Sequence, residues 1–348
     1  MKAVVKQVPE HGAVHVVSVS QPSPPAGDEV LVRIHSAALC GSDLHAFEYI
    51  PSYHSFLKIP VVLGHEGSGT VAAVGPEVTA FAPGDRVMSE AHLYCGTCPI
   101  CRRGNTTLCE NKLVLGITTD GVMREYALIR EKYLHAVPDG LSFAEAAAAQ
   151  AVSVSVHGVL GRVTIKPGDV ALVSGPGIIG LAAAQLARQC GAAVTITGTD
   201  ADEAIRMPVA RAMDFDAVNC ERENVIDYCM ARYGRKADIV LECSGSSSAL
   251  VSAVDAVRQG GTILLLGVPQ RDVTFPLARM IRAEVNLISS YGSSWEDYEK
   301  TLALLANGSL SIMPLLAPYP VKDAEKAFHD GIEKTVVKPV LQFVPDAG

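Results

Sequence analysis

The stretch "VALVSGPGIIGLAAAQLA", residues 170–187, decides the fold of this chain. An apolar run ends in a turn that contains Gly175, Gly177 and Gly180, and an Ala-rich run follows the turn. Alone, the spacing G-x-G-x-x-G is a weak signal. Between a strand and a helix it is typical of the turn that places a dinucleotide pyrophosphate at a helix N-terminus. A tight turn without a ligand is the alternative interpretation.

The residues after this stretch repeat the same pattern. From about Val154, apolar strands alternate with Gly turns and helices, as in "AVTITGTD" (193–200), "ADIVLECSG" (237–245) and "GTILLLGV" (261–268). Such alternation predicts a parallel sheet with crossover helices. We therefore predict an α/β, doubly wound domain over residues 154–289.

The residues before about 154 have a different texture. Short β-type runs are separated by Pro and Gly turns, which predicts an all-β first domain. These runs are "AVHVVSV" (13–19), "EVLVRIHSAAL" (29–39), "GTVAAVG" (69–75) and "DRVMS" (85–89). After about Ser290, a helical stretch (294–310) and a last strand, "KPVLQFV" (338–344), are expected.

Composition narrows the possible functions. A chain of 348 residues has room for about two domains. The net charge is −8 and no cluster of Lys and Arg is present, which argues against a nucleic-acid partner. The apolar stretch 171–187 is interrupted by "SGPGIIG", so no membrane segment is expected. Nine cysteines and no signal-like start favour a reducing cytoplasm over a disulfide framework.

Four of the nine cysteines are concentrated in "CGTCPICRRGNTTLC", residues 95–109. Cys95, Cys98, Cys101 and Cys109 have the spacing C-x2-C-x2-C-x7-C. Four thiolates converging on one tetrahedral ion leave it no open position, so we predict a structural zinc site. A redox-active C-x-x-C pair and an iron–sulfur cluster are the alternatives.

A second set of metal-ligand residues comes from "ALCGSDLH" (38–45) and "VLGHEGSGTVAAVG" (62–75). Cys40, His65 and Glu66 offer sulfur, nitrogen and oxygen donors. Such a mixed set usually marks a catalytic zinc that keeps one position for water or substrate. Singly, a Cys or His is more often a buried core residue, so the combination carries the prediction.

With these motifs the chain resembles the zinc-dependent medium-chain alcohol and polyol dehydrogenases, including the sorbitol and threonine dehydrogenases. The pattern G-H-E-x2-G-x5-G-x2-V, which begins at Gly64 and ends at Val78, is highly specific. The resemblance extends to the C-terminal "VVKPVLQF" (336–343) and covers nearly the whole chain. It implies a GroES-like β-barrel catalytic domain made of residues 1–153 and 290–348, with a Rossmann cofactor domain at 154–289 between them.

The resemblance also implies roles for single residues. Cys40, His65 and Glu66 would bind the catalytic zinc. Ser42 would hydrogen-bond the substrate oxygen, and His45 would pass its proton toward solvent. Asp43 would orient the ligand histidine, as carboxylates near metal sites do.

One position departs from the family pattern. Polyol and threonine dehydrogenases have an acidic residue within a stretch resembling "FAEAAAAQAVSVSVH" (143–157), where this chain has Gln150. A neutral amide is a poorer zinc ligand than a carboxylate. Gln150 is therefore a candidate ligand that has two alternatives, holding a water molecule or packing.

The nucleotide preference depends on the end of the second predicted strand, "VTITGTDADEAIR" (194–206). An acid there normally binds the ribose 2′-hydroxyl of NAD. Gly198 takes the place where many family members have Asp, Asp200 follows, and no basic residue comes before Arg206. We expect NAD, with NADP possible. The expected contacts are Gly175, Gly177, Ile178, Ile179, Gly180, Gly198, Thr199, Asp200, Gly267 and Val268.

The sequence thus predicts a cytoplasmic zinc-dependent dehydrogenase that oxidises a secondary alcohol, of a polyol or similar small compound, with NAD. An NADPH-dependent reductase or biosynthetic dehydrogenase of the same family is the first alternative. A zinc-ribbon binding protein is the second, although it leaves Cys40, His65 and the glycine turn without a role. The family also implies a homo-oligomer, a dimer or tetramer.

Overall fold

The computed structural model describes residues 1–344, and the chain divides into two compact units. Unit 1 contains Met1–Ala151, Ser293–Ser309 and the described residues from Leu316 onward. Unit 2 contains Val152–Gly292 and Leu310–Leu315. Both ends of the chain therefore build unit 1. The long helix α3 (Phe143–Gly161) carries the chain from the first unit into the second.

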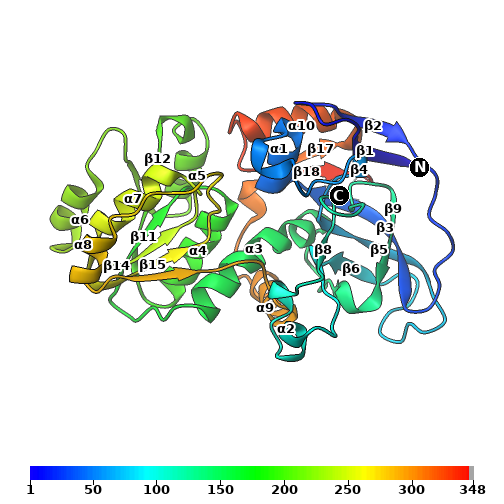
Figure 1. Cartoon of the computed structure of the whole chain (residues 1–348), viewed down its shortest axis with the longest axis horizontal. Coiled ribbons are helices and arrows are strands. Elements are labelled where there is room, and N and C mark those ends of the chain that lie inside the picture. The colour runs from blue at the N-terminus through cyan, green and yellow to red at the C-terminus, as the bar shows by residue number, and fades with distance from the viewer. Residues whose placement is uncertain (345–348) are drawn as a thin grey trace. The chain divides into compact units, whose positions relative to one another are not determined.

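Unit 2 is built on a six-stranded sheet in the order β13-β12-β11-β14-β15-β16, and all neighbouring strands are parallel (Figure 1). This order confirms the predicted doubly wound sheet, with its switch of direction between β11 and β14. The strands are β11 (Val170–Ser174), β12 (Ala193–Gly198), β13 (Asp216–Asn219), β14 (Ala237–Glu242), β15 (Val257–Leu265) and β16 (Asn286–Ser289).

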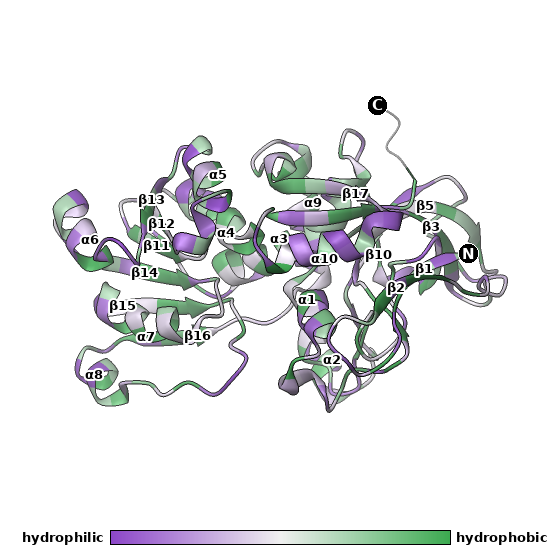
Figure 2. Cartoon of the chain, turned by 90° about the horizontal axis from the view of Figure 1, so that it is seen from above, coloured by the Kyte–Doolittle hydropathy of each residue, from purple (hydrophilic) through white to green (hydrophobic). Residues whose placement is uncertain are grey.

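Helices cover this sheet. Strands β11 and β14 are buried along their whole length and most of their residues are apolar, and Figure 2 shows the sheet largely in green. Helix α4 packs on β11 and β12, and α7 packs on β14 and β15. The helices are α4 (Ile178–Gln189), α5 (Arg206–Ala212), α6 (Val225–Tyr233), α7 (Ser247–Ala256) and α8 (Leu277–Arg282).

Unit 1 is β-rich. Its largest sheet has seven strands, in the order β10-β6-β5-β3-β18-β17 with β9 paired to β3, and a second sheet has the order β2-β1-β4. Strands β7 and β8 form a separate ribbon. The strands are β1 (Lys2–Lys6), β2 (Val14–Ser18), β3 (Glu29–Ala38), β4 (Val61–Val62), β5 (Glu66–Val74), β6 (Arg86–Ser89), β7 (His92–Leu93), β8 (Leu113–Val114), β9 (Tyr126–Arg130), β10 (Leu134–Ala136), β17 (Leu316–Pro320) and β18 (Lys338–Gln342).

Helices accompany these sheets, which corrects the expectation of an all-β first part. The helices of unit 1 besides α3 are α1 (Gly41–Glu48), α2 (Pro99–Arg102), α9 (Trp295–Ala306) and α10 (Ala324–Ile332). Helix α1 is too short to show a clear apolar period, so its start depends on a local cap. The Cys40 side chain accepts from the third residue of the helix, and Asp43 accepts from the Cys40 backbone N–H.

Within residues 1–344, one helix is long and apolar enough to cross a membrane by length and composition alone. This helix is α3, and 72% of its most apolar window is buried inside the protein. Such burial is typical of a core helix in a folded domain.

Candidate functional site

The mixed donor set converges where two strands of unit 1 lie side by side. Ala38 at the end of β3 pairs with Glu66 at the start of β5, so Cys40 lies close to His65 and Glu66. One donor atom from each of the three side chains lies within 4.8 Å of the other two. His65 and Glu66 are buried and Cys40 is half-buried. The structure therefore assembles the three donors that the sequence analysis singled out.

The glycines of this motif are required by close packing. Gly64 has a φ of +92°, and a Cβ there would lie 2.5 Å from Met123 Cγ. A Cβ on Gly69 would lie 1.9 Å from the Arg33 carbonyl oxygen of the neighbouring strand. A larger side chain at Gly64 would displace Met123, and one at Gly69 would push β5 away from β3, so the segment that carries His65 and Glu66 would lose its position.

The buried polar atoms of the site fit a bound cation. Glu66 Oε2 and His65 Nδ1 are buried without a hydrogen-bond partner among the described residues. Burial by itself disfavours the charged imidazole, but the negative charges of Asp43, Cys40 and Glu66 outweigh it and raise the pKa of His65 to about 9. Buried donor atoms without a hydrogen-bond partner, among acidic side chains, are what Zn²⁺ requires, so these residues could hold it.

Asp43 ties the two ligand segments together. Its buried carboxylate accepts hydrogen bonds from Cys40 N at 2.9 Å and Gly64 N at 3.2 Å, and Oδ1 lies 3.7 Å from His65 Nδ1. Ser42 Oγ lies 3.3 Å from His65 Nε2. The structure thus places both side chains against the donor set.

His45 lies one turn beyond Ser42 on α1, and positions three apart share a face of a helix. Its ring meets the Tyr53 ring edge-on at 5.7 Å. Burial lowers the pKa of His45, against the opposing charge of Glu48. The neutral imidazole therefore persists to lower pH than in an exposed histidine.

Gln150 lies in the first part of α3, within unit 1, and its side chain is buried. His92 on β7 was not among the site residues expected from the sequence. Burial and the charges of Lys112 and His65 lower the pKa of His92 to about 4, so it is a neutral group near the donor set. Nothing in its local pattern indicated this, because β7 reaches the site only through tertiary packing.

The four clustered cysteines form a closed set. Their sulfurs lie within 4.8 Å of one another, and Cys98, Cys101 and Cys109 are buried. Backbone N–H groups point at the sulfurs: Cys98 N donates to Cys95 Sγ at 3.3 Å, and Cys101 N donates to Cys98 Sγ at 3.4 Å. Hydrogen bonds from Thr97 and Cys98 lower the pKa of Cys95 to about 5. Donors aimed at four converging sulfurs fit a thiolate-bound ion better than a single redox pair.

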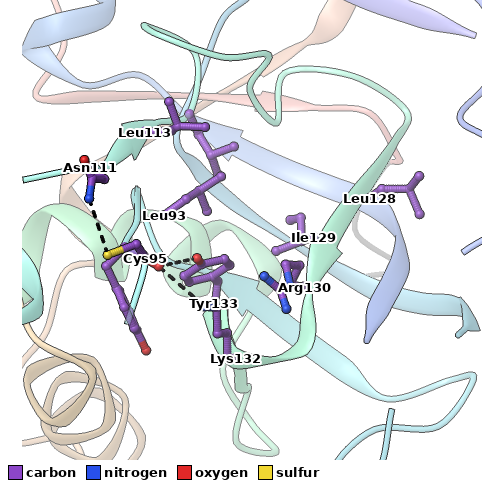
Figure 3. A pocket seen from close by; sticks show the side chains of 11 residues that line it. Leu93, Cys95, Asn111, Leu113, Leu128, Ile129, Arg130, Lys132 and Tyr133 are labelled. Atoms are coloured by element: carbon purple, nitrogen blue, oxygen red, sulfur yellow. Dashed lines mark hydrogen bonds between the residues drawn. The ribbon is translucent and has the colours of Figure 1, made fainter. Parts of the chain in front are cut away.

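A pocket of about 420 Å³ lies beside this lobe (Figure 3). Leu93 of β7, Leu113 of β8 and Leu128 of β9 are among the residues that line it, and Lys132 lies over the Tyr133 ring at 4.9 Å. Arg130 at its edge is already paired with Asp28 at 2.8 Å.

The glycine turn of unit 2 has the geometry of a nucleotide-binding turn. Gly175 has a φ of +95°, and a Cβ on Gly180 would lie 1.9 Å from the Gly175 carbonyl oxygen, so helix α4 packs closely on β11. A Cβ on Gly177 would meet nothing within 4 Å, so this residue faces open space. Ile178 begins α4 and is buried, and Ile179 is half-buried. A ligand can therefore approach the backbone at the helix N-terminus.

The other predicted nucleotide contacts lie at carboxyl ends of strands. Gly198 ends β12, and Thr199 and Asp200 follow it. Gly267 follows β15, and its N–H donates to the Glu242 carbonyl oxygen at 2.8 Å. Val268 is exposed. Ligands of doubly wound sheets bind at this edge.

Comparisons with known proteins agree with this arrangement. Residues 26–139 match the family described as "Alcohol dehydrogenase GroES-like domain", and residues 179–307 match "Zinc-binding dehydrogenase". A sorbitol dehydrogenase of Halalkalibacterium halodurans is 33% identical over 94% of this chain and 95% of its own length. An L-threonine 3-dehydrogenase of Escherichia fergusonii is also 33% identical, over the same shares. A solved chain from Sinorhizobium meliloti 1021, assigned as a zinc-binding dehydrogenase and bound to NADP, has a TM-score of 0.88 and 26% identity over 98% of both chains.

Proposed function

Because the chain belongs to the zinc-dependent medium-chain alcohol dehydrogenase family, we propose that it transfers hydride between a secondary alcohol of a polyol-like compound and NAD. The observation that carries this proposal is the convergence of Cys40, His65 and Glu66, in a chain that also has the open glycine turn at Gly177. The sorbitol dehydrogenase named above supports the substrate class.

We assign the catalytic role to residues 1–153 and 290–348, and the cofactor role to residues 154–289. Cys40, His65 and Glu66 would hold the catalytic zinc, with Gln150 as a further candidate ligand. Zinc held there supplies a Lewis acid that favours ionisation of an alcohol at neutral pH. Cys95, Cys98, Cys101 and Cys109 would hold the structural zinc.

The chain's own residues would then move the alcohol proton. Ser42 Oγ, next to His65 Nε2, binds the substrate hydroxyl and accepts its proton while releasing its own hydroxyl proton. His45, on the same face of α1 and mainly neutral at physiological pH, accepts that proton and passes it toward solvent. Asp43 keeps the two ligand segments in register through its backbone hydrogen bonds.

An NADPH-dependent reductase or biosynthetic dehydrogenase is the second candidate, favoured by the NADP bound to the similar S. meliloti chain. In either case we propose a homo-oligomer that acts in the cytoplasm on a small alcohol. All nine cysteines are free thiols in the structure, which suits a reducing compartment.

A screen of polyols, amino alcohols and sugar phosphates with both nucleotides tests this function. We expect oxidation of at least one secondary alcohol, with a higher kcat/KM for NAD than for NADP. A preference for NADP of about tenfold or more, which corresponds to about 1.4 kcal/mol, would favour the second candidate instead. If neither nucleotide is reduced with any alcohol, the proposal is wrong.

A further inference from the structure

We propose that Arg222 is a specificity-determining residue that gives the dinucleotide site a partner for a 2′-phosphate, so that NADP binds within about tenfold of NAD. This inference rests on the proposed dinucleotide-binding function. It differs from the expectation drawn from sequence, in which Arg206 was the first basic residue available after the second strand.

Arg222 lies near the carboxyl ends of β12 and β13, where the adenosine ribose is expected. Gly198 at the end of β12 pairs in register with Asn219 at the end of β13. Arg222 follows Asn219 by three residues, and its Nε donates to Asp200 Oδ1 at 2.6 Å. Asp200 after β12 and Arg222 after β13 are therefore in contact, although they lie 22 residues apart along the chain.

Gly198 excludes the usual recognition of NAD by an acid at the end of the second strand. A Cβ at this position would lie 2.6 Å from Met207 Sδ and 3.2 Å from Pro176 Cγ. An aspartate there would need both neighbours to move. The ribose must therefore be recognised from residues further along, and Asp200 is the first acid that follows.

Asp200 and Arg222 together can serve either ribose. The side chains are 58% and 63% exposed, so both are accessible to a ligand. A 2′-hydroxyl can donate to the Asp200 carboxylate. A 2′-phosphate can accept from the guanidinium, which contacts Asp200 through Nε and has further N–H groups in its planar fork.

The surrounding charges explain why neither nucleotide is expected to win by a large factor. Three further acids lie near Asp200, but each is engaged: Asp202 is near Arg206 at 3.7 Å, Glu203 is near Arg211 at 3.4 Å, and Glu221 accepts from Asp200 N at 2.7 Å. With Glu223, which directly follows Arg222, five acids against three arginines leave this end of the sheet negative. We therefore expect NAD to bind more tightly than NADP, and we expect Arg222 to keep the difference in affinity small.

The competing interpretation is that Arg222 forms only a surface ion pair. Exposed pairs contribute little to stability, so in that case its removal should affect neither folding nor nucleotide binding.

Binding of two adenosine fragments tests the inference without turnover. Calorimetry of the purified protein would compare 5′-AMP with 2′,5′-ADP, which carries a 2′-phosphate in addition. We expect Kd values within about tenfold of each other for the native chain. Arg222→Gln should weaken 2′,5′-ADP by about tenfold or more and leave 5′-AMP within about twofold, whereas Asp200→Asn should strengthen 2′,5′-ADP.

Arg232→Gln is the matched control, because Arg232 is an exposed arginine on α6 that pairs with Asp216 at 3.0 Å. Asp216 is the first residue of β13, whereas Arg222 comes after the last residue of that strand. The control variant should leave both fragments unchanged. Equal affinity of native protein and Arg222→Gln for 2′,5′-ADP would overturn the role of Arg222 while leaving the dehydrogenase proposal intact. Failure of the native protein to bind 5′-AMP, NAD or NADP at all would instead reject the dinucleotide site itself.

Discussion

Lys338 and Glu66 form a buried ion pair, with Lys338 Nζ 2.7 Å from Glu66 Oε1 and side chains 3% and 0% exposed. The two residues are 272 positions apart, and strand β3 brings them together because it pairs with β5 on one side and β18 on the other. The ammonium occupies one carboxylate oxygen, and the other oxygen, Oε2, has no partner among the described residues. Lys338 thus leaves Glu66 one donor for a metal.

Removal of this lysine should make stability depend on metal. In Lys338→Met the Glu66 carboxylate is left buried and unpaired, so the metal-free protein should lose about 3–5 kcal/mol of unfolding free energy. Zinc at Glu66 should restore part of that loss, because it replaces the missing positive charge. Urea unfolding with and without zinc measures both values. Lys338→Arg keeps the positive charge and is the control, which should lose less unfolding free energy than Lys338→Met. If Lys338→Met loses the same free energy with and without zinc, Lys338 does not act on the metal site.

The four-cysteine lobe should hold a zinc ion that supports folding. We expect about two zinc ions per chain, and Cys101→Ser should lose one of them together with unfolding free energy, since a closed thiolate site contributes directly to folding. Cys220→Ser, which changes an exposed cysteine of unit 2, should keep both ions. Metal analysis and thermal unfolding give the answer. Iron in place of zinc, or an active chain without metal, would contradict the assignment.

His45 should shape the pH dependence of alcohol oxidation. Burial holds its pKa below the ordinary value of about 6.5, so the native imidazole still accepts protons somewhat below neutral pH. His45→Ala should therefore slow oxidation by about 10²–10⁴-fold where proton removal is hardest, below neutral pH, and less at high pH where hydroxide takes the proton. Rates from pH 6 to 9 measure this. His15→Ala, an exposed histidine on β2, is the control; identical profiles for the two variants would remove His45 from the mechanism.

Gln150→Glu tests whether the neutral amide tunes the catalytic site. With Cys40 and Glu66 as the two anionic ligands, a neutral Gln150 leaves the zinc shell less negative than the family carboxylate would. Gln150→Glu should therefore raise the apparent pKa of oxidation and slow zinc loss to a chelator.

The competing expectation is that Gln150, 6% exposed, only packs. A carboxylate would then cost stability without moving the pH profile. Gln185→Glu, at a similarly buried glutamine in unit 2, reports the cost of a buried carboxylate together with the loss of the hydrogen bonds that Gln185 Nε2 donates to Leu181 and Ser311. An unmoved pH curve with faster zinc loss would reject the tuning role.

Local chemistry made much of this protein predictable. The turn at Gly175, Gly177 and Gly180 depends on backbone geometry within six residues, and the cysteine cluster depends on the spacing of its members within fifteen residues. Both can therefore be recognised in the sequence. Cys40 and the His65–Glu66 pair were also recognisable, because each lies in a short motif; packing requires the glycines Gly64 and Gly69 of the second motif. Helix α1 was missed because its eight residues depend on a single cap.

The sequence by itself determined the two kinds of domain, the four-cysteine cluster and the identity of the donor residues Cys40, His65 and Glu66, because each lies in a motif that is local along the chain. The pairing of β3 with β5 then brings Cys40 next to His65 and Glu66. Only the tertiary structure decided that Lys338 neutralises Glu66, that His92 lies near His65 and that Arg222 meets Asp200. These contacts depend on which strands pair and in which register, and a β-sheet joins residues at any separation along the chain. A lysine before a proline or an arginine in a polar loop has no local feature that reveals its partner.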